Sequence, residues 1–190
     1  MLKKVIRKSV SLLLALVLLL SIAAAMPVRV AAANGYLSRL PFDKILYGDI
    51  KYSDCVGKPT VVIFGGVSCS KCTFATFFID QFIEQKEIEV NVLFFDTYSS
   101  IAEIKNYFDS QNFNNVSAYR CVSNSLMWDI LRGGGINNTF WYPAILYFDK
   151  MGNIVKTTTD STNLDDISDN IAAAAGLKFP HRLTAPPIGR

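Results

Sequence analysis

Two cysteines separated by two residues are the part of this chain best suited to chemistry. Cys69 and Cys72 enclose Ser70 and Lys71, and they follow a short apolar run at residues 59–64. Two intervening residues place both sulfur atoms on consecutive turns of one helix face, where a disulfide can form and reopen without moving the backbone. A helix N-terminus favours thiolate over thiol, and the cation of Lys71 adds to this effect. We therefore predict thiol–disulfide exchange in which Cys69 attacks and Cys72 resolves the mixed disulfide.

Three other interpretations of this cysteine pair compete with redox chemistry. A structural disulfide is open to an exported chain, although a loop of this size restricts the unfolded chain little. A zinc site needs about four ligands, and the remaining candidates, Cys55, Cys121 and His181, stand apart in the sequence. The third alternative is a fold that keeps its cysteines idle. The redox interpretation requires neither a cofactor nor a metal.

The rest of the chain indicates an α/β domain, because apolar β-rich runs alternate with helical patterns from residue 59 onward. Within the first helical pattern, Phe74, Phe78 and Phe82 recur at every fourth residue and are predicted to lie in the core. Ser100 and Glu103 form a capping-box pattern at the start of the second. We predict strands at 59–64, 90–96, 117–122, 144–148 and 154–159, and helices at 71–86, 100–108, 125–132 and 164–175.

Several of these features together resemble a known family. A Gly-Lys-Pro motif at residues 57–59 precedes a hydrophobic strand and then Cys69-x-x-Cys72, and Tyr142-Pro143 precedes the hairpin. This pattern is similar to thioredoxin-like domains of the extracytoplasmic TlpA type. The resemblance implies a thioredoxin fold, which is an α/β fold with a central mixed β-sheet flanked by helices and, in this type, a strand-helix insertion before a cis-proline.

The same resemblance implies roles for residues outside the cysteine pair. Pro143 would be the cis-proline that faces the disulfide, and the backbone of Tyr142 would pair with an extended substrate strand beside Cys69. Without the resemblance, the ordinary preference of X-Pro bonds favours a trans proline that begins a strand. Phe140 and Trp141 are candidates for lining a substrate groove, although packing in the core is the commoner fate of aromatic residues.

Three positions depart from the pattern of the family. Ser68 stands where tryptophan is usual, and Lys71 stands where proline is frequent. Ile63 occupies the strand position at which cytoplasmic thioredoxins carry a buried acid, so Cys72 has no obvious protein base. A lysine beside the thiolate stabilises the reduced form, which makes the cysteine pair a better oxidant.

The two remaining cysteines are predicted to be free. An even number of cysteines permits a second disulfide between Cys55 and Cys121. However, Cys55 precedes the first buried strand and Cys121 ends a strand parallel to it, which places them at opposite edges of the sheet. Buried free thiols are therefore favoured over a second disulfide. If Cys121 reaches the carboxyl edge of the sheet, it becomes a candidate auxiliary thiol for Cys69.

The N-terminus carries most of the information about compartment. Four basic residues among residues 1–8 precede an uncharged apolar stretch at 9–28 and an alanine run at 31–33, which is the order of a secretory signal. An uncleaved membrane anchor through residues 9–28 is the alternative. Both interpretations place the domain outside the cytoplasm, either secreted or anchored to the outer face of the cytoplasmic membrane. We predict a signal peptide or anchor at 1–33, a thioredoxin-like domain at 34–178 and a flexible tail at 179–190.

The charge balance excludes a nucleic-acid partner. The chain has 19 basic and 16 acidic residues, and five of the basic ones but none of the acidic ones lie within residues 1–33. The remaining residues therefore carry 14 basic and 16 acidic side chains, a net charge of −2, which offers no basic excess for phosphates.

We therefore predict an exported thiol:disulfide oxidoreductase that exchanges the Cys69–Cys72 disulfide with protein thiols through a mixed disulfide. Its partners would be proteins with cysteines or disulfides and an unidentified redox partner that recharges the pair. The alternative is a non-catalytic interaction module on the thioredoxin fold, in which the disulfide is idle.

Overall fold

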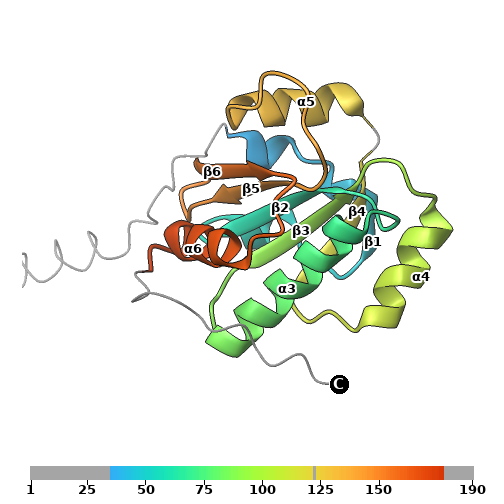
Figure 1. Cartoon of the computed structure of the whole chain (residues 1–190), viewed down its shortest axis with the longest axis horizontal. Coiled ribbons are helices and arrows are strands. Elements are labelled where there is room, and N and C mark those ends of the chain that lie inside the picture. The colour runs from blue at the N-terminus through green and yellow to red at the C-terminus, as the bar shows by residue number, and fades with distance from the viewer. Residues whose placement is uncertain (1–34, 122, 178–190) are drawn as a thin grey trace, which may run out of the picture. The chain divides into compact units, whose positions relative to one another are not determined.

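The computed structural model describes residues 35–121 and 123–177 of the chain. Their centre is a six-stranded mixed sheet in the order β1-β4-β3-β2-β5-β6 (Figure 1). The strands are β1 (Ile45–Tyr47), β2 (Thr60–Gly65), β3 (Asn91–Asp96), β4 (Val116–Arg120), β5 (Ala144–Phe148) and β6 (Ile154–Thr159). The helices are α2 (Tyr52–Cys55), α3 (Ser70–Lys86), α4 (Ile101–Gln111), α5 (Asn124–Gly133) and α6 (Leu164–Ala175), with 3-10 turns η1 (Tyr36–Arg39) and η2 (Phe42–Lys44).

Strands β2, β3 and β4 are parallel to one another, and β1, β5 and β6 each run antiparallel to their neighbours. Helix α3 connects β2 to β3, and α4 connects β3 to β4, as parallel neighbours require. The carboxyl ends of β2 and β3 therefore meet at one edge of the sheet, with Gly65 opposite Asp96. This edge is where the cysteine pair lies.

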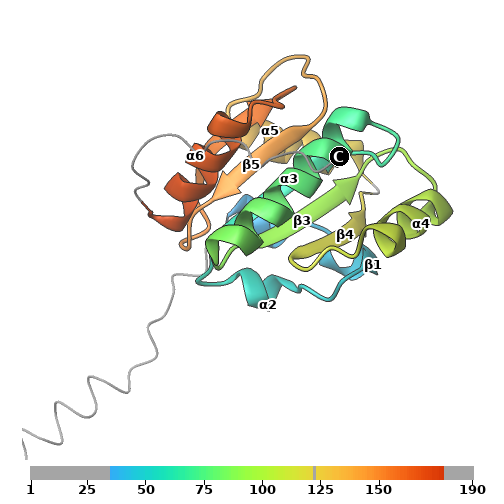
Figure 2. The ribbon, with the colours of Figure 1, turned by 60° about the horizontal axis from the view of Figure 1, so that its bottom comes forward.

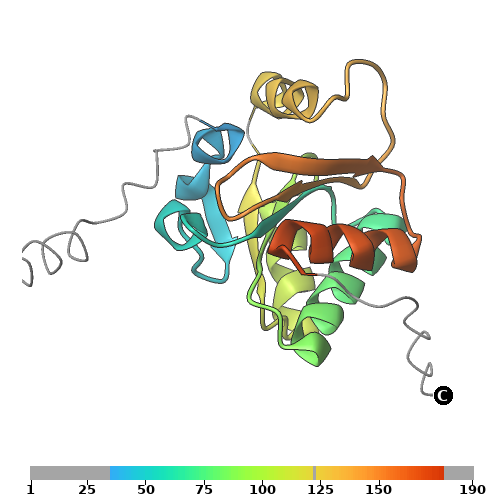
Figure 3. The same cartoon turned by 90° about the vertical axis from the view of Figure 1, so that its left-hand side faces the viewer.

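Alternate residues of the central strands build two apolar cores, one on each face of the sheet. Val61 and Ile63 of β2 point into the core under α3, α4 and α6, whereas Val62 and Phe64 point into the core under η1 and α5. Figure 3 shows the sheet nearly edge-on with α5 on one face and α3 and α6 on the other. In Figure 2, α3 lies over β3 and α6 lies beside β5. Burial on both faces explains why the sequences of these strands are continuous apolar runs.

The predicted strand and helix pattern is confirmed in its main features. The insertion before the proline consists of β4 and α5, and the capping box of Ser100 and Glu103 opens α4. The elements between residues 36 and 55, which are η1, η2, β1 and α2, lack a strong periodic signal because each is only three or four residues long.

One core prediction is wrong for part of α3. Phe82 is buried, but Phe74 is 46% exposed and Phe78 is half-buried. Four residues advance a helix by about 400°, so each step of four rotates the side chain by about 40° around the axis. A stripe at every fourth residue therefore turns away from the sheet, and Phe74 lies at the rim of the buried face.

The predicted signal peptide or anchor at 1–33 and the tail at 179–190 lie outside the described residues. Within residues 35–121 and 123–177, none of the helices is both long and apolar enough to span a bilayer.

Candidate active site

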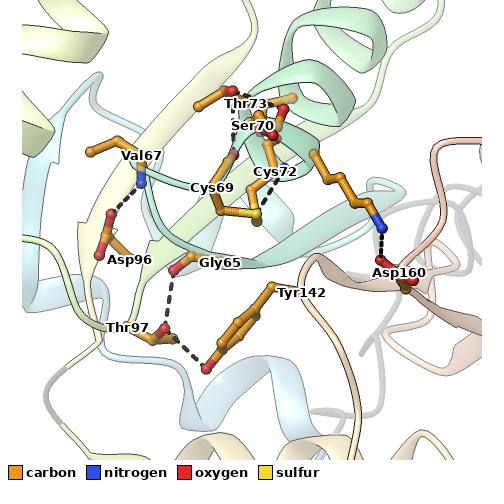
Figure 4. Close-up of a disulfide and its surroundings, with 12 residues drawn as sticks. Gly65, Val67, Cys69, Ser70, Cys72, Thr73, Asp96, Thr97, Tyr142 and Asp160 are labelled. Carbon is orange, nitrogen blue, oxygen red and sulfur yellow. Dashed lines mark hydrogen bonds and ion pairs between the residues drawn. A yellow bond between two sulfur atoms is a disulfide. The ribbon is translucent and has the colours of Figure 1, made fainter.

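Cys69 and Cys72 form a disulfide at the start of α3, with their Cα atoms 5.2 Å apart (Figure 4). Cys69 is the N-cap of the helix, and its sulfur accepts a hydrogen bond from the backbone N–H of Cys72 at 3.2 Å. Cys69 is partly exposed, whereas Cys72 is fully buried in the core under α3. The two sulfur atoms are therefore unequal, since only Cys69 is open to solvent.

A buried carboxylate holds the loop that leads from β2 to Cys69. Asp96, at the end of β3, is fully buried. One of its oxygens accepts from the N–H of Val67 at 2.9 Å, and the other accepts from the N–H groups of Tyr98 at 3.0 Å and Ser99 at 2.6 Å. The bond from Val67 ties the disulfide loop to the end of β3, and the bonds from Tyr98 and Ser99 hold the carboxylate in place for it. Because these donors occupy the carboxylate, Asp96 positions the loop beside the disulfide.

A second set of hydrogen bonds joins β2, β3 and the loop before β5. The carbonyl of Gly65 accepts from the N–H of Thr97 at 2.9 Å, and the Thr97 Oγ1 lies 3.1 Å from the same carbonyl. That hydroxyl also lies 3.1 Å from the hydroxyl of Tyr142, which contacts the sulfur of Met127 at 3.8 Å. Figure 4 shows the Tyr142 ring on the side of the disulfide opposite α3.

Gly65 also determines how closely α3 approaches the sheet. A Cβ at this position would lie 2.8 Å from the sulfur of Cys72 and 3.0 Å from its Cβ, which is closer than real Cβ contacts allow. Gly65 therefore leaves the space in which the buried sulfur lies.

The peptide bond between Tyr142 and Pro143 is cis, as the family resemblance implied, and the alternative of a trans proline is wrong. Pro143 is buried and directly precedes β5. The structure thus brings together Cys69, Cys72 and Tyr142, although Tyr142 is 70 residues from Cys72 in the sequence.

Lys71 does not stand beside the cysteines as an isolated cation. Its ammonium pairs with the carboxylate of Asp160, just after β6, at 2.5 Å. Asp160 was not among the residues that sequence reasoning selected, and neither were Asp96 and Thr97. Asp96 carried a signal that was available in the sequence, namely a carboxylate at the carboxyl end of the strand that follows the cysteine helix.

Cys55 and Cys121 are free and buried, which confirms the prediction of two free thiols. Burial raises the pKa of Cys55 to about 11 and also raises the pKa of Cys121. Cys121 reaches the carboxyl edge of the sheet, where its N–H donates to the carbonyl of Asp96, but its side chain packs on the face opposite Cys72. The hypothesis of an auxiliary thiol next to Cys69 gains no support from this position.

The aromatic residues before Pro143 divide between core and surface. Phe140 packs edge-to-face against Trp128 and Tyr142, with ring centroids 5.1 Å apart in each pair. Trp141, by contrast, is 73% exposed. Phe140 is therefore partly buried against the core under η1 and α5, whereas Trp141 is exposed to solvent.

No metal-binding group of three or more His, Cys, Asp or Glu side chains occurs in the part of the chain that the structure describes. His181, the histidine considered for zinc, lies outside that part.

No family model matches the chain, and no curated protein matches its sequence. Solved structures do match its fold. A secreted disulfide oxidoreductase of Mycobacterium tuberculosis, homologous to E. coli DsbE, shares 18% identity at a TM-score of 0.52, covering 68% of this chain and 92% of that one. A thioredoxin-family thiol:disulfide interchange protein from Chlorobium tepidum shares 15% identity at a TM-score of 0.53, covering 67% and 86%.

A thioredoxin-like protein in its oxidised form is also similar, with 19% identity, a TM-score of 0.56 and coverage of 70% of this chain and 88% of that one. All three similarities cover about two thirds of this chain and most of the neighbour's length. The chain therefore has the thioredoxin fold, with a disulfide between Cys69 and Cys72 at the start of α3.

Proposed function

We propose that this chain is a thiol:disulfide oxidoreductase that acts on protein cysteines through Cys69 and Cys72. The observation that carries the proposal is the asymmetry of the pair, since Cys69 is partly exposed at a helix start and Cys72 is buried one turn inside. Solved structures described as a disulfide oxidoreductase and a thiol:disulfide interchange protein share this fold, which supports the assignment.

Cys69 is proposed as the attacking residue because its environment favours a thiolate. The N–H of Cys72 donates to its sulfur at 3.2 Å, and the N-terminus of α3 adds a partial positive charge. An anionic sulfur in contact with solvent can reach a substrate disulfide, whereas the buried Cys72 can reach only Cys69. This difference gives the two cysteines separate roles.

In the reductive direction, the Cys69 thiolate attacks one sulfur of a substrate disulfide and forms a mixed disulfide, and the other substrate sulfur leaves as a thiolate. Cys72 then loses its proton and attacks the sulfur of Cys69. The remaining substrate sulfur leaves, so the substrate gains two electrons and the Cys69–Cys72 disulfide is restored. The oxidative direction is the reverse of these steps, and an external redox partner determines which direction is used.

We propose that Tyr142 and Pro143 receive the substrate chain. Tyr142 lies across the disulfide from α3 and is held by its hydroxyl contact with Thr97. An extended segment that carries the substrate cysteine would lie along this loop with its sulfur next to Cys69. The exposed ring of Trp141, at the edge of the same loop, offers apolar contact to that segment.

We also propose that the domain, at residues 34–178, works outside the cytoplasm. The basic and apolar pattern of residues 1–33 supports export, and the Mycobacterium tuberculosis neighbour is described as secreted. Cleavage of this segment would release a secreted domain, and retention would leave it anchored on the outer face of the membrane.

The reduction of insulin by dithiothreitol tests the proposal. The wild type should accelerate insulin precipitation, and Cys69→Ser should fall to the rate without protein. Cys121→Ser is the matched control, because it removes a buried thiol from the other face of the sheet and should keep the wild-type rate. Equal rates for the wild type and Cys69→Ser would contradict catalysis and favour the interaction module.

A further inference from the structure

Asp160 connects two parts of the candidate site that are far apart in the sequence. Its carboxylate lies 2.5 Å from the ammonium of Lys71, the residue between the two cysteines that directly precedes Cys72. Its backbone N–H donates to the carbonyls of both Trp141 and Pro143, at 3.1 and 3.0 Å. One residue therefore contacts both the disulfide motif and the proline loop, as Figure 4 shows for the contact with the motif.

The backbone conformation of Asp160 makes this double contact specific. Its φ is +54°, in the left-handed region that Asn, Asp and Gly adopt more readily than other residues. The residue directly follows Thr159, which pairs with Ala144, the first residue of β5. Because Asp160 lies at the end of the paired strands β5 and β6 and has a left-handed backbone conformation, its N–H points to the proline loop and its carboxylate points to α3.

We propose that Asp160 is a positioning residue that joins the disulfide motif to the proline loop and offsets the charge of Lys71 within that motif. This inference rests on the proposed function and deepens it, because it assigns a residue that regulates the reactivity of the attacking sulfur. Lys71 alone would stabilise a Cys69 thiolate, and the carboxylate opposes that effect. A charge just after the end of β6 therefore contributes to the redox poise of the cysteine pair.

The exposure of the Lys71 and Asp160 side chains determines how strongly their charges affect Cys69. The side chains of Lys71 and Asp160 are 52% and 42% exposed, so solvent screens the pair and a modest effect is expected. Asp96 and Arg120 are the charged residues at the ends of the adjacent strands β3 and β4. The carboxylate of Asp96 is held by backbone N–H groups, and Arg120 donates to the carbonyl of Ser99, so both stay in place when the Lys71 pair is changed.

Charge substitutions in the full-length chain test the proposal. Asp160→Asn keeps the N–H bonds and suits a positive φ, but it frees the lysine charge, so the measured pKa of reduced Cys69 should fall by roughly 0.3–0.7 pH units. Lys71→Gln leaves the carboxylate unpaired and should raise that pKa by a similar amount. The double variant should lie within about 0.2 pH units of the wild type. The pKa is read from the ultraviolet absorbance of the thiolate.

The reduction potential of the cysteine pair, measured by equilibration with glutathione, should follow the same signs. Asp160→Asn should make the pair more oxidising, and Lys71→Gln should make it less oxidising. The matched control is Asp129→Asn, which breaks the exposed pair with Arg39 on the opposite face of the sheet and should change neither quantity. A merely structural role for Asp160 would not produce opposite shifts in the two single variants.

Unchanged values in both single variants, or shifts of the same sign, would overturn the inference. Neither measurement uses a protein substrate, so its result is independent of the insulin assay. If the shifts appear but Cys69→Ser leaves the insulin rate unchanged, the charge coupling holds and the proposed function fails. If insulin reduction depends on Cys69 but the shifts are missing, the proposed function holds and the role of Asp160 fails.

Discussion

The four cysteines of the chain occupy two contrasting environments on opposite faces of the same sheet. Cys69 and Cys72 lie at the start of α3 in a disulfide, where the sulfur of Cys69 accepts a backbone N–H bond and the residue is partly exposed. Cys55 and Cys121 remain free thiols in the core under η1 and α5, where burial raises their pKa. The residue type is identical, so the helix start, the hydrogen-bond donor and the exposure account for the difference in chemistry.

The comparison also separates the roles within the reactive pair. Cys72 is as buried as the free thiols, yet it is bonded to Cys69 because the turn of the helix places the two sulfur atoms together. Burial alone therefore does not decide whether a cysteine of this protein is bonded, since Cys72 has a neighbouring sulfur one turn away and the buried Cys55 and Cys121 are free.

The largest effect is expected from removing the sulfur of Cys72, which we propose resolves the mixed disulfide. Cys72→Ser should lower insulin turnover on the order of 100-fold, because attack by a neighbouring sulfur within the same molecule has no bimolecular substitute of comparable rate. The mixed disulfide between Cys69 and the substrate should accumulate and be visible on a non-reducing gel. Cys55→Ser should accumulate none. A mixed disulfide trapped by Cys69→Ser and not by Cys72→Ser would reverse the assigned roles.

Alkylation of the reduced protein measures the contrast directly. The pKa of Cys55 is raised to about 11, so near neutral pH its thiolate fraction is about 100-fold below that of an ordinary thiol. Iodoacetamide should therefore label Cys69 at least 100-fold faster than Cys55, as followed by mass spectrometry of the peptides. Labelling in urea is the control, since unfolding should make the rates similar. Comparable rates in the native protein would remove the basis of the comparison.

Replacement of cysteine by serine should lower the free energy of unfolding by different amounts at Cys55 and at Cys69. Cys55→Ser places a hydroxyl in an apolar core and should lower the free energy of unfolding by about 1–3 kcal/mol. Cys69→Ser keeps a good N-cap and should lower it by less than about 0.5 kcal/mol. Both are compared with the wild type under reducing conditions by urea denaturation. A larger cost at Cys69 would mean that this sulfur has a structural role.

The smallest of the four effects should be the loss of folding stability at alkaline pH. The pKa of Cys55 is about 11 in the folded chain against an ordinary value of 9.0, so the unfolded chain releases its proton first as pH rises. The contribution of Cys55 to the free energy of unfolding is fully present below the unfolded pKa. Above that pKa it falls, by about 1 kcal/mol between roughly pH 8 and pH 10. Because buried tyrosines such as Tyr147 also contribute, the loss is measured as the difference from Cys55→Val. Parallel pH curves for the two proteins would contradict this assignment.

Much of the fold could be predicted because it depends on local patterns. Apolar runs identified the central strands, and the motif around Cys69 together with Tyr142-Pro143 identified the fold and the cis bond. The contacts that organise the site could not be predicted in this way. The bond from Val67 to Asp96 spans 29 residues, and the pair of Lys71 and Asp160 spans 89, so each depends on strand register and loop geometry that periodicity does not encode.

The prediction for Phe74 failed for a related reason. Spacing along a helix identifies the residues that share a stripe, but the edge of the buried face is set by how the helix is docked on the sheet. Phe74 lies within the first turns of α3, close to the disulfide, and its exposed ring is a consequence of that docking.

The absence of a side chain at Gly65 has a consequence for how the redox pair could be altered. The sulfur of Cys72 rests directly on the main chain of β2, because a methyl group there would lie 2.8 Å from it. A Cβ atom at position 65 would push the first turn of α3 away from the sheet. The buried sulfur of Cys72 would then become more exposed to solvent. The burial of Cys72, on which the proposed difference between the two cysteines depends, is thus determined by the main chain of β2.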